Sequence, residues 1–113
     1  MNFIETYKVD HDICDKFIDL FHQFESHHSH GQIMKSDEKG GVQDLSVKDS
    51  TDLSINWWRS QSQPTVKKYQ EILTNNFLDY RNKYEVVQQL RVGLTDIFNI
   101  QHYKPNGGYK AWH

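Results

Sequence analysis

The sequence has few of the residues that would place it in a specialised class of protein. It contains one cysteine, so an internal disulfide is excluded. Two prolines and six glycines among 113 residues are too few for a collagen-like or low-complexity chain. Its uninterrupted apolar runs are short, whereas a membrane-spanning helix needs roughly 20 apolar residues. These absences leave a globular fold as the expected class.

An excess of charge of either sign is also lacking. Thirteen basic and fifteen acidic side chains give a net charge of -2, and no stretch gathers five basic residues. Nothing therefore predicts binding to the phosphates of a nucleic acid. Residues 1–8 lack the basic and apolar regions of a signal peptide. We expect a cytoplasmic protein that binds neither nucleic acid nor membrane.

Aromatic residues compensate for a low content of aliphatic ones. The mean hydropathy is -0.82, which is polar for a globular domain, but the chain carries fifteen aromatic residues. Such residues supply much buried area, and disordered chains rarely contain so many. The length fits one domain over residues 1–113, which would bury roughly 65% of its unfolded surface.

Two segments have the periodicity of amphipathic helices. The apolar residues of 11–25 fall on one helical face, and Asp10 precedes them as a candidate N-cap. Pro64 suits the first turn of a helix over 64–84, whose apolar residues recur at spacings of three and four. On this second helix we expect the buried side chains to be Tyr69, Leu73, Phe77 and Tyr80.

Strand patterns occur at 2–9, 95–103 and 109–113, with shorter pieces at 32–35 and 43–48. The predicted fold class is therefore α+β, with two amphipathic helices packed on a small, mostly antiparallel sheet.

Two features near the first helix have both a chemical and a structural interpretation. The segment 26–30 places three imidazoles within four positions, which suggests a metal site, but a solvated loop is the simpler interpretation because a fourth ligand is not evident. Cys14 lies on the apolar face of the helix, so we expect a buried structural cysteine rather than a reactive thiolate.

Two features in the middle of the chain are also expected to be structural. Trp57 and Trp58 resemble a stacking platform, but on an extended segment they would point to opposite faces, which favours packing in or near the core. The polar run 48–52 reads as a turn with local Asp and Ser hydrogen bonds.

The last sixteen residues, 98–113, carry the most information. Strand alternation divides the side chains of the first part between two faces, one with Asn99, Gln101 and Tyr103 and the other with Phe98, Ile100 and His102. A turn over Pro105–Gly108 follows, and beyond it Tyr109, Ala111 and His113 share a face. From spacing alone, a hairpin with a solvated polar face explains this segment.

The same segment resembles the start of the catalytic core of 2-oxoglutarate- and Fe(II)-dependent oxygenases of the prolyl 4-hydroxylase-like kind. The order of Tyr103, the Pro105–Gly108 turn, Tyr109 and His113 matches that family. Upstream, residues 12–18 resemble its early helix. The polar run 48–52 followed by a long Tyr-rich helix has the order found in phage and marine bacterial members. The resemblance covers nearly the whole chain, but only residues 98–113 are specific.

The resemblance implies roles for three residues. His113 would be the first iron ligand, Tyr103 would hydrogen-bond the co-substrate carboxylate, and Tyr109 would line the mouth of the pocket. His102, of opposite strand parity, is not expected to be a ligand and should face the helices or solvent. Non-haem Fe(II) needs two His and one carboxylate, which leaves three coordination positions for 2-oxoglutarate and oxygen.

The resemblance also implies an incomplete enzyme. The acidic ligand two positions beyond His113, the second histidine and the basic residue for 2-oxoglutarate are not in the sequence. We therefore expect the N-terminal portion of an oxygenase domain, with an incomplete double-stranded β-helix (jelly-roll) core. The complete enzyme would use Fe(II) and 2-oxoglutarate to hydroxylate a peptidyl proline or a small substrate. The fragment itself would bind neither, would be inactive, and would self-associate through exposed sheet edges.

Two other interpretations remain open from the sequence. One is a non-enzymatic binding or assembly module that uses an aromatic surface. The other is a metal-binding protein that uses the histidines of 26–30.

Overall fold

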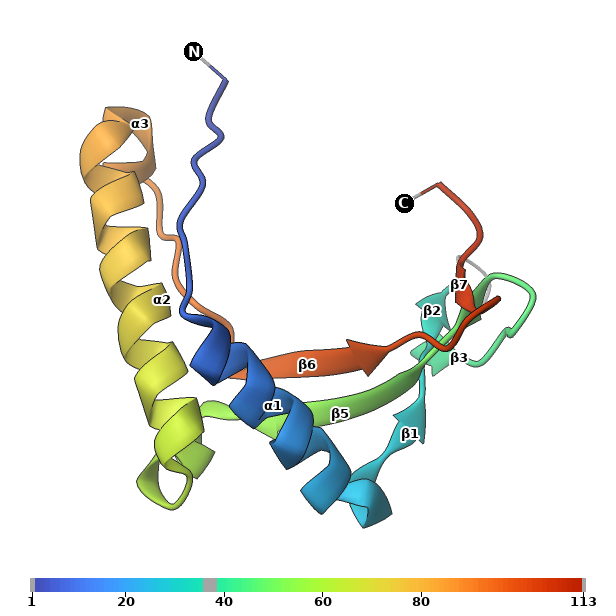
Figure 1. The fold of residues 1–113 in the computed structure, drawn as a ribbon. Helices are drawn as coiled ribbons and strands as arrows, with labels where there is room; N and C mark the ends of the chain where they lie inside the picture. The colour runs from blue at the N-terminus through green and yellow to red at the C-terminus, as the bar shows by residue number, and fades with distance from the viewer. Residues whose placement is uncertain (1, 36–38, 113) are drawn as a thin grey trace. The chain divides into compact units, whose positions relative to one another are not determined.

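The computed structural model describes residues 2–35 and 39–112, which form an α+β fold with three α-helices and several short strands (Figure 1). Two short 3-10 helices, η1 and η2, accompany them. The elements in chain order are α1 (His11–Gln23), η1 (Glu25–His27), β1 (Ser29–His30), β2 (Ile33–Met34), β3 (Gly41–Val42), β4 (Lys48–Asp49), β5 (Thr51–Asn56), η2 (Trp57–Gln61), α2 (Pro64–Lys83), α3 (Glu85–Gln88), β6 (Ile97–His102) and β7 (Gly108–Tyr109).

The described strands form three small sheets. The largest has the order β1-β5-β6, and the other two are the pairs β2-β3 and β4-β7. The pairs β1-β5, β2-β3 and β4-β7 are antiparallel. Within the described residues no sheet closes into a barrel. The predicted mixture of helices and small antiparallel sheets is confirmed, whereas the jelly-roll core stays a prediction.

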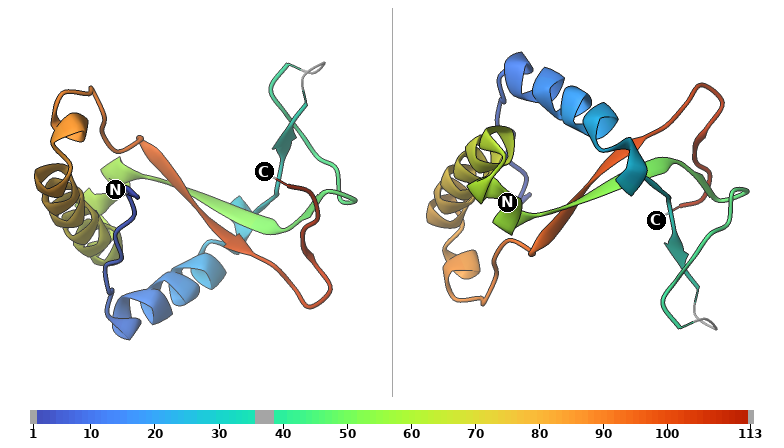
Figure 2. Two further views of the ribbon diagram at one scale, coloured as in Figure 1. Left: turned by 90° about the horizontal axis from the view of Figure 1, so that it is seen from above. Right: turned by 90° about the horizontal axis from the view of Figure 1, so that it is seen from below.

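The chain divides into two compact units, each built from two stretches of sequence. The first unit covers residues 2–20 and 56–98 and contains α2 and α3. The second covers the described residues of 21–55 and 99–112 and contains the pairs β2-β3 and β4-β7. Figure 2 shows α2 in yellow in the first unit and β2 in teal in the second.

Four aromatic rings form the side-chain cluster of the first unit, named here the aromatic cluster: Phe17, Trp57, Tyr69 and Phe98. The rings of Trp57 and Phe98 stack with their centroids 4.5 Å apart. Phe17 meets Tyr69 and Phe98 edge-on, at 5.2 and 5.9 Å. The indole N–H of Trp57 donates to the carbonyl of Thr95. Edge-on and offset contacts are the favoured geometries of aromatic pairs, so the cluster joins α1, η2, α2 and β6.

The two adjacent tryptophans lie in the 3-10 helix η2, so the prediction of an extended segment is wrong. The expected packing in or near the core is found for Trp57 and not for Trp58. Trp57 packs in the aromatic cluster, whereas Trp58 is 57% exposed and carries the guanidinium of Arg59 over its ring at 4.4 Å. A single 3-10 turn separates the two side chains because successive residues there point in different directions.

The helix α2 spans Pro64–Lys83 and confirms the predicted helix, with the proline in its first turn. Its buried apolar residue is Val66, and Tyr84 just beyond its end is buried too. Four side chains of α2 were expected to be buried and are only half-buried: Tyr69, Leu73, Phe77 and Tyr80. No described helix is long and apolar enough to cross a membrane.

The first helix is shorter and its buried stripe narrower than predicted. It ends at Gln23, and its buried side chains are Ile13, Leu20 and Phe21. These positions leave Cys14 outside the stripe and exposed, so the expectation of a buried cysteine is wrong. One residue corresponds to about 100° around an α-helix, which suffices to turn a neighbour of a buried residue towards solvent.

The strand predictions were correct over 32–35, which contains β2, and over 95–103, which contains β6. Those over 43–48 and 109–113 overlap β4 and β7 by one residue each. Residues 2–9 form no strand, and 110–112 lie outside the short strand β7. The hairpin interpretation is also wrong, because β7 pairs with β4.

Candidate functional site

A tight turn joins β6 to β7 where the sequence predicts one. The N–H of Gly107 donates to the carbonyl of Lys104 at 2.8 Å and closes the turn. Asn106 and Gly108 have positive φ values of 69° and 146°. Asparagine and glycine are the residues that adopt such conformations most easily. The local sequence Pro105–Gly108 therefore fixes this turn, and the prediction is confirmed.

Tyr103 directly follows β6. Its hydroxyl donates to the side-chain oxygen of Gln101 at 3.2 Å, and the residue is 36% exposed. This contact agrees with the predicted alternation, which put both side chains on one face of the strand. The Tyr103 hydroxyl is therefore held near solvent by a neighbour on its own strand.

Tyr109 lies on β7, opposite Lys48 of β4. It is half-buried, and the ammonium of Lys48 lies 6.0 Å from the centre of its ring. Just beyond the strand, the N–H of Lys110 donates to the carbonyl of Val47 at 2.6 Å. Tyr109 is thus positioned by β4, whereas Tyr103 is positioned by β6.

The predictions for the two histidines of this segment, His102 and His113, differ in whether the structure tests them. His113 lies outside the described residues, so its role as an iron ligand stays a prediction. The ring of His102 lies edge-on to Phe21 at the end of α1, with centroids 5.7 Å apart. His102 was expected to face the helices or solvent, and its ring contacts α1 while the residue remains exposed.

A buried charge cluster lies next to Tyr109 in the second unit. It consists of Lys48, Ser50 and Asp52, which are only 6, 4 and 6% exposed. The ammonium of Lys48 lies 3.5 Å from Asp52 Oδ2, and the Ser50 hydroxyl donates to Asp52 Oδ1 at 2.7 Å. A Cβ on Gly31 would collide with Ser50 Oγ and Lys48 Cε, so only glycine fits above the cluster. Buried charges require such partners because desolvation is costly.

Sequence reasoning missed the burial of this cluster because it interpreted 48–52 as a turn with local Asp and Ser hydrogen bonds, of which the Ser50–Asp52 bond is present. The segment instead forms β4 and the start of β5. The signal was present, since Lys48, Ser50 and Asp52 alternate with period two and so share one face of a strand. A polar face of this kind normally indicates solvent exposure, and only the tertiary structure covers it.

Asp44 shapes the turn that leads into β4. Its carbonyl accepts the N–H of Lys48 at 2.9 Å, and its carboxylate accepts both the hydroxyl and the N–H of Ser46. The Ser46 hydroxyl, followed by an ion pair with Lys35 at 2.9 Å, lowers the pKa of Asp44 to about 2. Local hydrogen bonding between Asp and Ser therefore occurs at Asp44 as well as within 48–52, where it was predicted and where Ser50 donates to Asp52.

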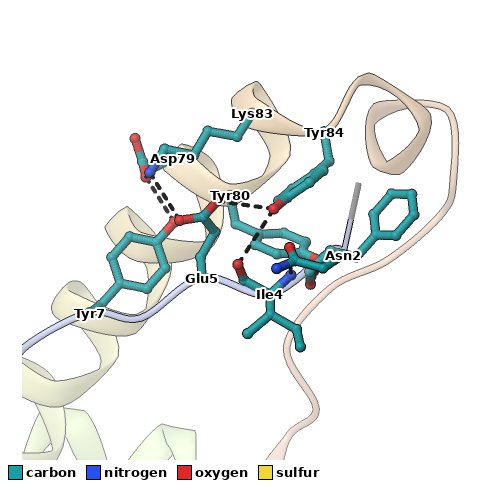
Figure 3. A network of polar contacts seen from close by, with 9 residues as sticks. Asn2, Ile4, Glu5, Tyr7, Asp79, Tyr80, Lys83 and Tyr84 are labelled. Carbon is teal, nitrogen blue, oxygen red and sulfur yellow. Dashed lines mark hydrogen bonds and ion pairs between the residues drawn. The ribbon is translucent and has the colours of Figure 1, made fainter.

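A second polar network lies in the first unit and joins residues 2–9, the N-terminal strap, to the end of α2 (Figure 3). The hydroxyl of Tyr7 donates to Asp79 at 2.7 Å, and that of Tyr84 donates to Glu5 at 2.9 Å. Lys83 pairs with both carboxylates, at 3.2 and 3.4 Å. These side-chain contacts hold the strap against the end of α2, although residues 2–9 form no strand.

The contacts of this network shift the pKa values of the side chains that form it. Burial, followed by the hydrogen bond to Asp79, raises the pKa of Tyr7, and burial with the bond to Glu5 raises the pKa of Tyr84. The Tyr7 hydroxyl lowers the pKa of Asp79, and Asp79 raises the pKa of Lys83. Each direction favours the protonation state that keeps the strap bound at neutral pH.

The strap should therefore loosen at both ends of the pH scale. The Asp79 contribution is present above its ordinary pKa of 3.8 and is lost as the pH falls through its lowered value. The tyrosine contributions are present below 10.0 and are lost as the pH rises through their raised values. Methyl NMR of Ile4 should detect both transitions, with Ile33 of the second unit as the control. An Ile4 signal that is constant from pH 3 to 11 while Ile33 is also constant would contradict this role.

The histidine-rich segment is more structured than expected. His28 stacks on Phe21 with centroids 4.0 Å apart, and its Nε2 lies 2.6 Å from the Phe21 carbonyl. Ser29 and His30 form β1. The solvated-loop interpretation is thus wrong for His28. Across residues 2–35 and 39–112, no three His, Cys, Asp or Glu side chains gather in a way that could hold a metal ion.

Comparison with protein-family models, with curated protein sequences and with solved structures finds no match for this chain. The functional interpretation consequently depends on the residues themselves.

Proposed function

We propose that this chain supplies the N-terminal part of a 2-oxoglutarate- and Fe(II)-dependent oxygenase that hydroxylates a peptidyl proline or a small substrate. The observation that supports the proposal is the succession of β6, Tyr103, a closed turn, and Tyr109 on β7. This is the order and spacing that the sequence shares with the oxygenase family. The antiparallel pairs of the second unit would form the beginning of the jelly-roll core.

The described side chains fit a co-substrate better than they fit a metal. The Tyr103 hydroxyl is exposed, so it can exchange the Gln101 amide oxygen for a carboxylate oxygen of 2-oxoglutarate at little cost. Tyr109 would line the pocket mouth, and His113 would be the one iron ligand in this sequence. The remaining ligands would come from further sequence. When bound, Fe(II) with 2-oxoglutarate supplies the oxidising chemistry, while these residues bind and orient.

Iron binding tests the proposal. The 113-residue chain should bind Fe(II) and 2-oxoglutarate more weakly than about 10 μM, because one imidazole without supporting ligands makes a poor site. A protein extended to include an acidic residue at position 115 and the rest of the domain should bind both. In that protein His113→Ala should abolish iron binding, as measured by titration calorimetry under anaerobic conditions.

The matched control is His102→Ala in the same extended protein. His102 packs on Phe21, so its loss should leave iron binding unchanged. If the histidines show the opposite behaviour, the strand register assumed here is wrong and the iron assignment loses its basis. A downstream sequence without Asp or Glu at position 115 would also refute the oxygenase.

A second candidate function is an assembly module. Two aromatic residues, Phe21 and Tyr84, are buried, whereas Trp58 and Trp112 are among the exposed ones. Apolar side chains are also exposed on α3 and the segment that follows it in the first unit. They are Val86, Leu90, Val92, Leu94 and Ile97, with 39–55% of their surface exposed. Exposed apolar groups of this kind favour association.

Self-association is therefore expected for either function. Size exclusion with light scattering should show dimers or larger species at about 100 μM. Strand β6 contains six residues without a charged Lys, Arg, Asp or Glu, and such strands pair readily at their edges. Asn99→Lys should shift the protein towards monomer, with Asn75→Lys on α2 as the control. A wild-type protein that is monomeric at this concentration would argue against exposed sheet edges.

A further inference from the structure

The buried charge cluster lies beside the short pair β4-β7, whose register determines where Tyr109 is placed. Each strand has two residues, paired as Lys48 with Tyr109 and Asp49 with Gly108. So short a ladder specifies its register weakly, and a slip by one residue turns every side chain to the opposite face. One further backbone hydrogen bond, from the N–H of Lys110 to the carbonyl of Val47, supports this register, and side-chain contacts complete its selection.

The side chain of Lys48 distinguishes the observed register from its neighbours. In this register the ammonium of Lys48 faces the ring of Tyr109 at 6.0 Å, within the range of a cation–π contact. A slip in one direction would bring Lys110 opposite Lys48, and two like charges at a buried strand pair repel each other. A slip in the other direction would place Gly108 opposite Lys48, and the ammonium would then have no aromatic ring to contact.

The Lys48 ammonium is itself fixed in place. Asp52 lies 3.5 Å away, and Ser50 orients the other carboxylate oxygen with a 2.7 Å hydrogen bond. The absence of a side chain at Gly31 makes room for the lysine stem, because a Cβ there would lie 2.7 Å from Lys48 Cε. Apolar side chains of similar volume would often stabilise a fold as well as a buried ion pair does. A role in selecting one arrangement explains why charged groups occupy this site.

We infer that Lys48, held by Asp52, is a positioning residue that selects the register of β7 on β4 and thereby places Tyr109. Only the role given to Tyr109, which would line the co-substrate pocket, rests on the proposed function. The selection of register itself depends on contacts within the second unit.

Nuclear magnetic resonance of the 113-residue chain tests this inference without iron or 2-oxoglutarate. Cross-strand Overhauser effects between backbone protons of residues 48 and 109 report the observed register, and those between 48 and 110 report a slipped one. In the wild type, a single set of Tyr109 ring signals and the 48–109 contact should be seen. Lys48→Met should reduce the ratio of observed to slipped register by about tenfold and add a second set of Tyr109 signals.

Two further variants make the outcome decisive. Lys104→Met removes a lysine from the neighbouring turn and should leave one register. If Lys48→Met does not fold, the double variant Lys48→Met with Asp52→Leu removes both buried charges and should fold while still losing register selection. A single register with unchanged Tyr109 signals in the folded Lys48 variants would overturn the inference.

Lys48→Arg supplies the conservative comparison. It keeps the positive charge and should retain one register, although the larger guanidinium should lower stability because position 48 is only 6% exposed. Failure of register selection would not affect the iron test, and failure of iron binding in the extended protein would not affect the register. The two proposals can therefore be refuted separately.

Discussion

Replacing Asp52 with alanine is expected to lower the free energy of unfolding by about 3–5 kcal/mol. The substitution leaves the ammonium of Lys48, of which 7% of the side chain is exposed, without its carboxylate partner. It also leaves the Ser50 hydroxyl without the acceptor that it has at 2.7 Å. A loss of this size is a large fraction of the stability of a small domain. Urea denaturation followed by circular dichroism would measure it.

The control distinguishes an unpaired charge from a lost contact. The double variant Lys48→Met with Asp52→Leu removes both charges and should recover most of the loss, because the cost arises from leaving one charge buried alone. Asp49→Ala removes an exposed carboxylate from β4, the strand of Lys48, and should change the free energy of unfolding by less than about 0.5 kcal/mol. An Asp52→Ala protein as stable as the Asp49→Ala protein would mean that Lys48 reaches solvent.

Replacing Phe98 with alanine is expected to lower the stability of the first unit by about 3 kcal/mol, at the low end for a buried aromatic residue. Phe98 is half-buried, but it contacts three rings of the aromatic cluster: Phe17, Trp57 and Tyr69. Each aromatic pair contributes about 0.5–1.5 kcal/mol beyond the burial of its area. Removing the ring should also shift the fluorescence of Trp57, which reports the same unfolding transition.

Phe77→Ala is the matched control for Phe98. Phe77 is also half-buried, on α2 of the same unit, and no ring contact joins it to another described residue. Its replacement should cost clearly less, about 1–2 kcal/mol, since it loses area but no aromatic pair. Equal losses for the two variants would show that area alone, rather than the cluster, determines stability in this unit.

The helices were predictable because their evidence is local. The spacing of three and four over 64–84 and the first-turn position of Pro64 correspond to α2. The Pro105–Gly108 turn was predictable for the same reason, since Asn106 and Gly108 are the residues that tolerate its positive φ values. In both cases the backbone conformation depends on residues within a few positions of each other.

The strap shows where local evidence misled. Residues 2–9 have the alternation of a strand, yet their partners are Asp79, Lys83 and Tyr84 at the end of α2. Phe3 has a positive φ of 56°, so the backbone is not extended throughout the strap. Alternation indicates a backbone conformation at most. It does not indicate which element lies beside the segment, and that contact spans more than seventy residues of sequence.

The candidate site was predictable in part. Tyr103 faces Gln101 and His102 faces Phe21, as strand alternation required. The pairing of Tyr109 with Lys48 was not foreseen, because a hairpin partner for β7 was expected. Pairing between strands depends on loop closure and on what each face buries, neither of which is encoded at the strand itself.

The sequence by itself determined the α+β class, the two long helices and the turn before Tyr109, because propensity and periodicity act over short distances. Only the tertiary structure decided that Lys48, Ser50 and Asp52 are buried. Three alternating polar side chains can lie on a face exposed to solvent, or on a buried face where each polar group has a hydrogen-bond or ion-pair partner. Gly31 and Tyr109, which come from distant segments, lie next to the Lys48 side chain in the folded protein.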